Sequence, residues 1–274
     1  MRKPWPTGKQ SVVFRSAAGW GDSIYAVAIV NELRKQFPEI IVRTRHPHIF
    51  SWMHGVLPVQ WSKHGEDIAI HYSGRKQCPE TNQFQDLLFA CCLPIDIEFR
   101  IDWKVMNKGL IERMKAAAEG KRICIVAAPH TVFGRRDGYG AELTPKWDGY
   151  QAIIDAFKHK LFFVQVGLIR EGANFRGIGM DLIGKVSDTD TLDLATSADC
   201  VLGQHGYSIP LAEAFAKPLF VIYSRRGLNS HDPYIKFSTA QKTNTRSTSH
   251  HAVDDEPIQT IIKKAGECYG LPFQ

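Results

Sequence analysis

The sequence predicts an α/β protein made of two lobes, each a parallel sheet of the Rossmann type covered by helices. Short apolar runs rich in Val, Ile and Phe alternate with helical segments along the whole chain. This alternation is typical of parallel strands that are joined by crossover helices. With 274 residues, the chain is long enough to give each lobe its own hydrophobic core. We place the lobe boundary near residue 108, so that residues 1–108 form the first lobe, residues 109–255 the second, and residues 256–274 a closing helix.

The first lobe contains strand-like apolar runs that are separated by a long helix and by turn residues. The segment Asp22–Phe37 carries apolar residues at helical spacing, which predicts a helix directly after the first strand. The strands are expected at Ser11–Ala17, Ile40–Arg45, Val59–Ser62 and Asp67–Ser73, and a second helix at Thr81–Cys92.

The second lobe repeats this alternation after a helix at Asn107–Glu119. The segment Ser224–Asp255 is rich in Ser, Thr, Asn, His and Arg and shows little periodicity, so we expect a long surface loop there. A last helix is expected at Pro257–Cys268. The other strands are expected at Arg122–Ala128, Leu161–Gly167, Asp199–Gln204 and Leu219–Tyr223, and the other helices at Trp147–His159, Thr189–Ala198 and Ile209–Ala216.

The composition excludes several classes of protein. No apolar run approaches the roughly 18 residues that span a bilayer, and the N-terminus lacks the apolar stretch of a secretory signal, which favours a cytoplasmic location. The 6 cysteines and 11 histidines show no CxxC or HExxH spacing, so neither a disulfide framework nor a dedicated metal site is expected. A net charge of +6 favours anionic partners, among them nucleotides, nucleic acid and the surface of a membrane.

A glycine-rich turn, Ala18–Ile24, lies between the first strand and the first helix and carries one carboxylate. Open parallel sheets bind ligands at the carboxyl ends of their strands, which is where we expect Gly21 and Asp22. Asp22 has a structural explanation, because an acidic residue at a helix N-terminus accepts hydrogen bonds from free N–H groups and stabilises the helix by about 1 kcal/mol. The alternative is a catalytic carboxylate.

The first strand of the second lobe leads into a loop with several basic side chains. Arginine can hold phosphate oxygens through paired hydrogen bonds, and a helix N-terminus attracts anions. The loop can therefore hold a diphosphate, and a solvated basic surface loop explains the same residues equally well. The donor-binding candidates in this loop are His130, Thr131, Arg135, Arg136 and Lys146.

A second glycine turn, Gly203–Pro210, follows the strand Asp199–Gln204 and opens a helix. Gly206 allows the backbone to approach a ligand closely, and Ser208 can cap the helix. Such a turn can present N–H groups to an anion, or it can simply be a capped turn. The candidate residues for binding phosphate are His205, Gly206, Tyr207 and Ser208.

Two further residues extend the candidate donor site. Lys185 lies in a short segment before a helix, where backbone groups can hold a flat base. Glu171 follows the strand Leu161–Gly167, where a carboxylate can accept hydrogen bonds from a ribose, and it can equally be an exposed loop residue without a role.

The order of these motifs resembles glycosyltransferase family 9, the ADP-heptose:lipopolysaccharide heptosyltransferase family, whose members have the GT-B fold. The similarity covers most of the chain. Four segments carry it: Gly21-Asp22 with the helix that ends Leu33-Arg34-Lys35-Gln36-Phe37-Pro38, Pro129-His130-Thr131, Asp181-Leu182-Ile183-Gly184-Lys185, and Ala198–Gly203 with Leu211–Pro218.

The resemblance implies an inverting transfer in which Asp22 is the general base that deprotonates an acceptor hydroxyl. It also implies that no metal or other cofactor is needed, because Thr131, Lys146 and the segment His205–Ser208 would neutralise the donor diphosphate. The resemblance further implies that the helix Pro257–Cys268 packs back on the first lobe. The chain departs from the family at Ala28, His205 and Pro210, which leaves the donor base and sugar open.

Glu213 is similar to a glutamate that contacts the ribose in UDP-dependent glycosyltransferases, because it follows His205 at the matching spacing. The alternative is an ordinary helix residue that faces the core.

The partners that follow are a nucleotide sugar as donor and a bacterial surface glycan or glycolipid, similar to the lipopolysaccharide core, as acceptor. One alternative is a DNA glycosyltransferase that acts on hydroxymethylated bases, with Lys236, Lys242 and Arg246 on the phosphates. Others are a sugar-nucleotide epimerase or hydrolase of the same architecture, and a nucleotide-binding module without activity. The oligomeric state is not predicted.

Overall fold

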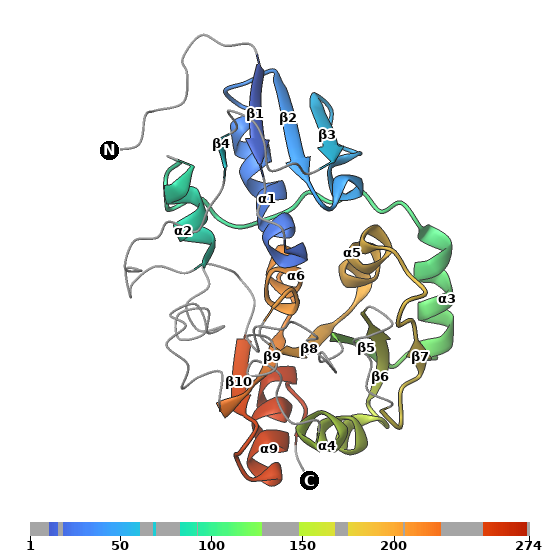
Figure 1. Cartoon of the computed structure of the whole chain (residues 1–274). Helices are drawn as coiled ribbons and strands as arrows, with labels where there is room; N and C mark the ends of the chain where they lie inside the picture. Colours follow the sequence, from blue (N-terminus) through green and yellow to red (C-terminus); the bar gives the residue numbers. More distant parts are fainter. Residues whose placement is uncertain are drawn as a thin grey trace, which may run out of the picture.

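Two parallel sheets, one in each lobe, form the framework of the protein (Figure 1). The α/β architecture expected from the sequence is therefore confirmed. The structure is a computed structural model, and it describes residues 11–15, 19–60, 68–69, 83–91, 93–127, 148–167, 175–204, 206–225 and 249–272.

The first sheet has the strand order β3-β2-β1-β4, and its neighbouring strands are parallel. Its strands are β1 (Ser11–Arg15), β2 (Glu39–Thr44), β3 (Val56–Gln60) and β4 (Ile68–Ala69), and its helical elements are α1 (Trp20–Leu33), η1 (Pro47–Phe50) and α2 (Gln83–Ala90). Helix α1 is buried at every position from Ser23 to Val30, because it packs on its own sheet and also against the second lobe. Strand β3 begins before the expected Val59, and the short turn η1 was not expected.

The second sheet has the strand order β10-β9-β8-β5-β6-β7, again with parallel neighbours. Its elements are α3 (Lys108–Ala118), β5 (Arg122–Ala127), α4 (Asp148–Phe157), β6 (Leu161–Val166), β7 (Met180–Asp181), α5 (Asp188–Ser197), β8 (Cys200–Gln204), α6 (Ser208–Ala214), β9 (Leu219–Tyr223), β10 (Ser249–Val253) and α9 (Ile258–Tyr269). The strands β5, β6, β8 and β9 are almost completely buried, as expected for apolar runs covered on both faces.

Helix α3 shows how the sequence sets element boundaries. The Asn107 side chain caps its start by accepting a hydrogen bond from the Leu110 backbone N–H at 3.1 Å. At its end, Glu119 and Gly120 have φ angles of 49° and 81°, in the left-handed region that stops a helix. Both boundaries match the expected helix Asn107–Glu119.

Strand β10 is a correction to the sequence analysis. It lies inside the segment Ser224–Asp255, which we expected to be a surface loop, and it pairs in parallel with β9 from Ser249↔Leu219 to Val253↔Tyr223. Its sequence, SHHAV, has too few apolar residues to show strand periodicity. The edge of the sheet tolerates this polarity, since β9 is its one partner among the described strands.

The position of the last helix is a second correction. Helix α9 packs against α4, β9 and β10 of the second lobe, at the opposite end of the molecule from the first sheet (Figure 1). Its buried side chains, including Ile261, Ala265 and Tyr269, join the core formed with Tyr150 and Phe220. The expectation that it packs back on the first lobe is therefore wrong, because its apolar face is used within its own lobe.

The lobes meet along α1 and α6, and the chain crosses between them through residues 93–107, the linker. The buried carboxylate of Asp193 in α5 holds this linker. It accepts hydrogen bonds from Trp103 Nε1 at 2.6 Å and from the backbone N–H groups of Met106 and Asn107 at 3.1 and 2.6 Å. One hydrophobic cluster runs from Phe14 in the first sheet to Val166 in the second. The described helices include none that is long and apolar enough to cross a membrane.

Candidate active site

The first glycine turn places a carboxylate at the start of α1. Gly19 occupies the N-cap position and Asp22 lies in the first helical turn. The Asp22 carboxylate accepts a hydrogen bond from the Gly19 backbone N–H, as the capping interpretation predicts. The approach is so close that a Cβ atom on Gly19 would lie 2.7 Å from Asp22 Oδ2. This position of the carboxylate therefore requires glycine at residue 19.

Capping does not account for the protonation behaviour of Asp22. Burial raises the pKa of its carboxyl group from 3.8 to about 6, and the hydrogen bond from Gly19 only partly offsets this. A helix cap in contact with water would keep a low pKa, because the N–H groups and the helix dipole favour the ionised form. The structure thus places Asp22 where its carboxylate is ionised at neutral pH but is more basic than an ordinary aspartate.

The second lobe approaches this turn directly. A Cβ atom on Gly21 would lie 3.2 Å from Tyr207 Cα and 3.3 Å from Pro210 Cγ, so a side chain at residue 21 would push α1 and α6 apart. One turn further along α1, the Tyr25 hydroxyl donates a hydrogen bond to Glu213 Oε2 at 3.0 Å. Segments of both glycine turns predicted from the sequence are therefore in contact at the lobe junction.

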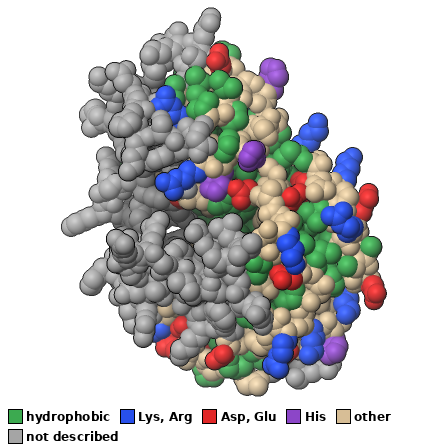
Figure 2. Space-filling view, turned by 45° about the vertical axis from the view of Figure 1, so that its right-hand side comes forward, with side chains coloured by type: hydrophobic (Ala, Val, Ile, Leu, Met, Phe, Trp, Pro, Cys, Tyr) green, Lys and Arg blue, Asp and Glu red, His purple; other side chains and the backbone are tan. Residues whose placement is uncertain are grey.

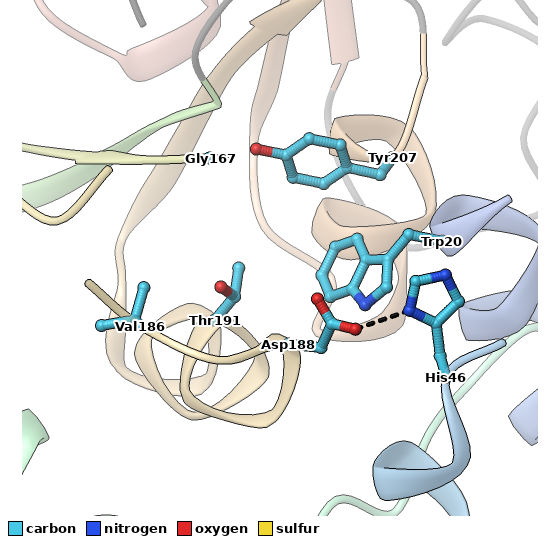
Figure 3. A pocket seen from close by; sticks show the side chains of 7 residues that line it. All are labelled: Trp20, His46, Gly167, Val186, Asp188, Thr191 and Tyr207. Atoms are coloured by element: carbon cyan, nitrogen blue, oxygen red, sulfur yellow. Dashed lines mark hydrogen bonds and ion pairs between the residues drawn. The ribbon is translucent and has the colours of Figure 1, made fainter. Parts of the chain in front are cut away.

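A cavity of about 120 Å³ lies beside this contact (Figure 3). It is placed at the carboxyl ends of β2, β6 and β8 and at the start of α1 and α5, where open parallel sheets bind ligands. Both lobes contribute to it. Its lining consists of Trp20 and His46 from the first lobe and Gly167, Val186, Asp188, Thr191 and Tyr207 from the second.

Two contacts between the lobes shape the cavity. The rings of Trp20 and Tyr207 meet edge to face, with 4.9 Å between their centroids and 79° between their planes. His46 Nδ1 lies 2.6 Å from Asp188 Oδ2. In Figure 3 the indole of Trp20 lies between the Tyr207 ring and the His46–Asp188 pair. Trp20 Nε1 is buried and has no hydrogen-bond partner among the described residues.

The chemistry of this lining favours an uncharged group over a phosphate. Its described side chains include two aromatic rings and the Asp188 carboxylate, and none of them is Lys or Arg. The start of α5 is already occupied, because Ser187 and Asp190 form a reciprocal capping box there. The cavity volume matches a single ring, such as a sugar or a base, and not a whole nucleotide sugar.

The structure locates the predicted donor-binding residues in three kinds of place. Gly21, Gly206 and Tyr207 lie at the lobe junction, and Gly206 has a φ of 140°, which favours glycine. Ser208 and Glu213 are buried, with the Ser208 hydroxyl donating to the Gln204 carbonyl at 2.6 Å. Lys185 is exposed and donates to the Asp181 carbonyl at 2.8 Å. The predicted residues that lie outside the described ones are His130, Thr131, Arg135, Arg136, Lys146, Glu171, His205, Lys236, Lys242 and Arg246.

The sequence analysis missed several residues of the cavity. Trp20 lies in the first glycine turn but is not among the predicted site residues, and neither is His46. His46 closely follows the end of β2, and Asp188 is the first residue of α5. Their positions after a parallel strand and at a helix start were signals that could have identified both.

The charges on the described surface are mixed. On the face shown in Figure 2, Lys and Arg side chains alternate with Asp and Glu side chains and do not form a continuous basic patch. The described residues also contain no group of three or more His, Cys, Asp or Glu side chains placed to hold a metal ion.

Several solved structures share this fold. A glycosyl transferase of family 9 from Veillonella parvula DSM 2008 matches with a TM-score of 0.67 at 8% sequence identity, over 95% of this chain and 97% of that chain. The E. coli ADP-heptose LPS heptosyltransferase II matches with a TM-score of 0.58 at 9% identity, over 94% and 98%. The E. coli heptosyltransferase WaaC with ADP matches with a TM-score of 0.59 at 10% identity, over 94% and 99%.

These matches establish the GT-B fold, with two parallel-sheet lobes that face each other across a junction. No protein-family model and no curated protein sequence matches the chain. At identities of 8–10%, the likeness to the solved structures concerns architecture. Any activity has to be argued from the residues of this chain.

Proposed function

We propose that this protein is a glycosyltransferase that moves a sugar from a nucleoside diphosphate sugar to an acceptor hydroxyl, with inversion at the anomeric carbon. The observation that carries the proposal is Asp22, a carboxylate with a pKa of about 6 at the junction of two lobes in a GT-B fold. The names of the similar structures support the reaction class, since they are a glycosyl transferase and two heptosyltransferases.

In the proposed reaction, Asp22 accepts the proton of the acceptor hydroxyl while the acceptor oxygen forms its bond to the anomeric carbon. The bond from that carbon to the diphosphate oxygen breaks, and the electron pair leaves with the nucleoside diphosphate. Attack from the face opposite the leaving group inverts the anomeric centre. A pKa of about 6 suits this step, because Asp22 is ionised at neutral pH while its proton affinity is closer to the working pH.

We assign the uncharged ring of the donor to the cavity between the lobes. Trp20 and Tyr207 supply apolar surface for a ring, and Trp20 Nε1 supplies a buried donor. The phosphates are assigned to the loop with Thr131, Arg135 and Lys146, because the described lining offers no cation for them. Neutralisation by such side chains needs no metal ion or other cofactor, so metal independence is part of the proposal.

For the acceptor, we propose a hydroxyl of a bacterial surface glycan or glycolipid. The support is that one of the similar structures is an ADP-heptose LPS heptosyltransferase. A soluble oligosaccharide from a lipopolysaccharide core is therefore the first acceptor to test.

The proposal is tested in two stages with the purified protein. A thermal-shift screen of nucleoside diphosphates first identifies the base, since a ligand at about 100 times its dissociation constant adds roughly 2.7 kcal/mol to the folded state. The matching nucleotide sugars are then supplied with and without acceptor, in the presence of EDTA. We expect nucleoside diphosphate release only when both substrates are present, and a product with inverted anomeric configuration by NMR.

Other results would point elsewhere. Release without any acceptor would indicate a hydrolase or an epimerase in place of a transferase. Loss of transfer in EDTA, with recovery on adding a divalent cation, would contradict metal independence. A screen in which no nucleoside diphosphate stabilises the protein would contradict the proposed reaction itself.

A further inference from the structure

Tyr25 and Glu213 form a buried hydrogen bond across the lobe junction. The Tyr25 hydroxyl in α1 donates to Glu213 Oε2 in α6 at 3.0 Å, and the two residues are 188 positions apart in the sequence. Their side chains are only 2% and 4% exposed. A hydrogen bond to a charged group in such a place is worth more than one at the surface, because water does not compete for it.

The surroundings keep Tyr25 in its role as a donor. Phe84 from α2 and Phe99 from the linker pack on its ring, with centroid distances of 5.6 and 4.8 Å. Burial, and then the neighbouring Glu213 carboxylate, raise the pKa of the Tyr25 hydroxyl well above its ordinary value, so it keeps its proton. The other ionisable groups that influence Tyr25 are Asp22 and Tyr223, and the Tyr223 ring in turn meets His251 edge to face at 5.8 Å.

This hydrogen bond is close to Asp22 in the chain and in space. Tyr25 follows Asp22 by three residues in α1, so both side chains lie on neighbouring parts of one helix face. Gly21 meets Tyr207 and Pro210 on the adjacent part of the junction. Together these contacts fix the first two turns of α1 against both the start and the end of α6.

We propose that Tyr25 and Glu213 are positioning residues, which hold the start of α1 against α6 so that the Asp22 carboxylate stays partly buried beside the lobe junction. The proposal rests on the proposed function, in which Asp22 acts as the base. It gives Glu213 a role different from the ribose contact that the sequence suggested. Glu213 acts through Tyr25 on the catalytic carboxylate and does not touch the donor.

Loss of the hydrogen bond has a defined consequence. Without the Tyr25 donor, the Glu213 carboxylate has to recruit water into the junction, because a buried charge with fewer hydrogen bonds is costly. Water near α1 then hydrates Asp22. Since burial is the main cause of its raised pKa, hydration lowers that pKa toward 3.8. The charge of Glu213 is not among the causes that raise the pKa of Asp22. Replacing Glu213 by a neutral hydrogen-bond acceptor should therefore leave the Asp22 pKa in place.

The test measures the pKa of Asp22 by carbon-13 NMR of protein labelled in its aspartate carboxyl groups, with Asp22→Asn to assign the signal. We expect the Asp22 pKa to be near 6 in the wild type. It should fall by about one unit or more in Tyr25→Phe and in Glu213→Met. In Glu213→Gln it should keep the wild-type value. The last variant keeps an oxygen that accepts the Tyr25 hydrogen bond. Glu213→Met replaces the acceptor by an apolar side chain of similar size, which covers the case that Tyr25→Phe does not fold.

A matched control separates positioning from general loosening of the lobes. Trp103→Phe removes the hydrogen bond between the linker and the Asp193 side chain, and both residues are far from Asp22 in the chain. The two backbone N–H groups that donate to Asp193 stay in place. We expect it to lower stability while the Asp22 pKa stays near 6. Equal pKa changes in Trp103→Phe and Tyr25→Phe would overturn the positioning role, and so would an unchanged pKa in both Tyr25→Phe and Glu213→Met.

Kinetics then distinguish this inference from the proposed function. Tyr25→Phe and Glu213→Met are expected to lower kcat at least about tenfold with the donor KM within about twofold, whereas Glu213→Gln, which keeps the hydrogen-bond acceptor, should lose far less. If Asp22→Asn is inactive but Tyr25→Phe keeps the wild-type kcat and pKa, the proposed function holds and the positioning role fails. If Asp22→Asn keeps full transfer, the proposed function fails, and the pKa measurement still decides the positioning role because it requires no substrate.

Discussion

The two glycine turns at the lobe junction share a local architecture and differ in chemistry. Gly19 precedes α1, and Gly206 precedes α6 after β8. In the first turn the Asp22 carboxylate lies at the start of α1, where burial raises its pKa to about 6. In the second turn, the Ser208 hydroxyl donates a hydrogen bond to the Gln204 carbonyl at 2.6 Å, and the Tyr207 ring lines the cavity.

The difference teaches that a strand, a glycine and a helix start do not by themselves define a catalytic turn. The two turns differ in the side chain that they place near the junction. The first turn holds a carboxylate with a raised pKa, whereas the Ser208 hydroxyl of the second turn bonds within its own lobe. In the proposed function, the first turn supplies the reactive group and Tyr207 of the second lines the cavity that takes the donor ring.

The largest expected effect comes from removing the reactive group of the first turn. Asp22→Asn keeps the size of the side chain and its hydrogen-bond acceptor but cannot take up the acceptor proton. Transfer should fall about 10²–10⁴-fold, while donor affinity measured by calorimetry stays as in the wild type. Asp102→Asn is the matched control, because Asp102 is 74% exposed and pairs only with Arg100 among its described ion-pair partners. Similar losses in both variants would contradict the role of Asp22.

A smaller effect is expected from moving the Asp22 carboxylate without changing it chemically. In Gly19→Ala the new Cβ would lie 2.7 Å from Asp22 Oδ2, so the carboxylate has to move, while the backbone φ of −79° is suitable for alanine. We expect kcat to fall about 10- to 100-fold. Gly109→Ala in α3 is the control, because the nearest described atoms, on Arg113 and Asn107, would lie 4.0 Å from its Cβ. This variant should leave transfer unchanged. Wild-type kcat in Gly19→Ala would show that the position of the carboxylate is not critical.

The smallest effect is expected from substituting Tyr207, the residue of the second turn that lines the cavity. Tyr207→Leu removes the ring that meets Trp20 and lines the cavity, so the donor KM should rise about 3- to 10-fold with little change in the pH dependence of kcat. Tyr207→Phe keeps the ring and removes the hydroxyl, whose hydrogen bond to the Val166 carbonyl is long, at 3.4 Å. It should therefore behave as the wild type. A shifted pH dependence in Tyr207→Leu would mean that the two turns are not functionally separate.

Much of the fold could be predicted from the sequence, because its signals are local. The buried strands Arg122–Ala127 and Leu161–Val166 are continuous apolar runs, and α3 carries its own cap at Asn107. Strand β10 could not be predicted, because a polar edge strand is defined by the neighbour it pairs with. The place of α9 could not be predicted either, since its apolar face fits either lobe in principle.

The candidate site was only partly predictable for the same reason. Gly21 and Asp22 are marked by a strand, a glycine and a helix start within a few residues. The pairs Tyr25–Glu213 and His46–Asp188 join residues that are 188 and 142 positions apart, and no local pattern connects them. The raised pKa of Asp22 follows from burial in the folded chain, which the sequence around residue 22 does not describe.

The most direct test of the central claim, that burial in the first turn raises the pKa of a carboxylate, is the unfolding free energy of Asp22→Asn relative to the wild type as a function of pH. Because the folded state raises the Asp22 pKa from 3.8 to about 6, its protonated form stabilises the fold below about pH 4, and this contribution is lost as the pH rises through 6. We predict that Asp22→Asn is more stable than the wild type by about 1–3 kcal/mol at pH 7.5, with a difference that shrinks toward pH 4. A variant that is less stable by about 1 kcal/mol at pH 7.5 would show that Asp22 is simply a helix cap, and would contradict the account.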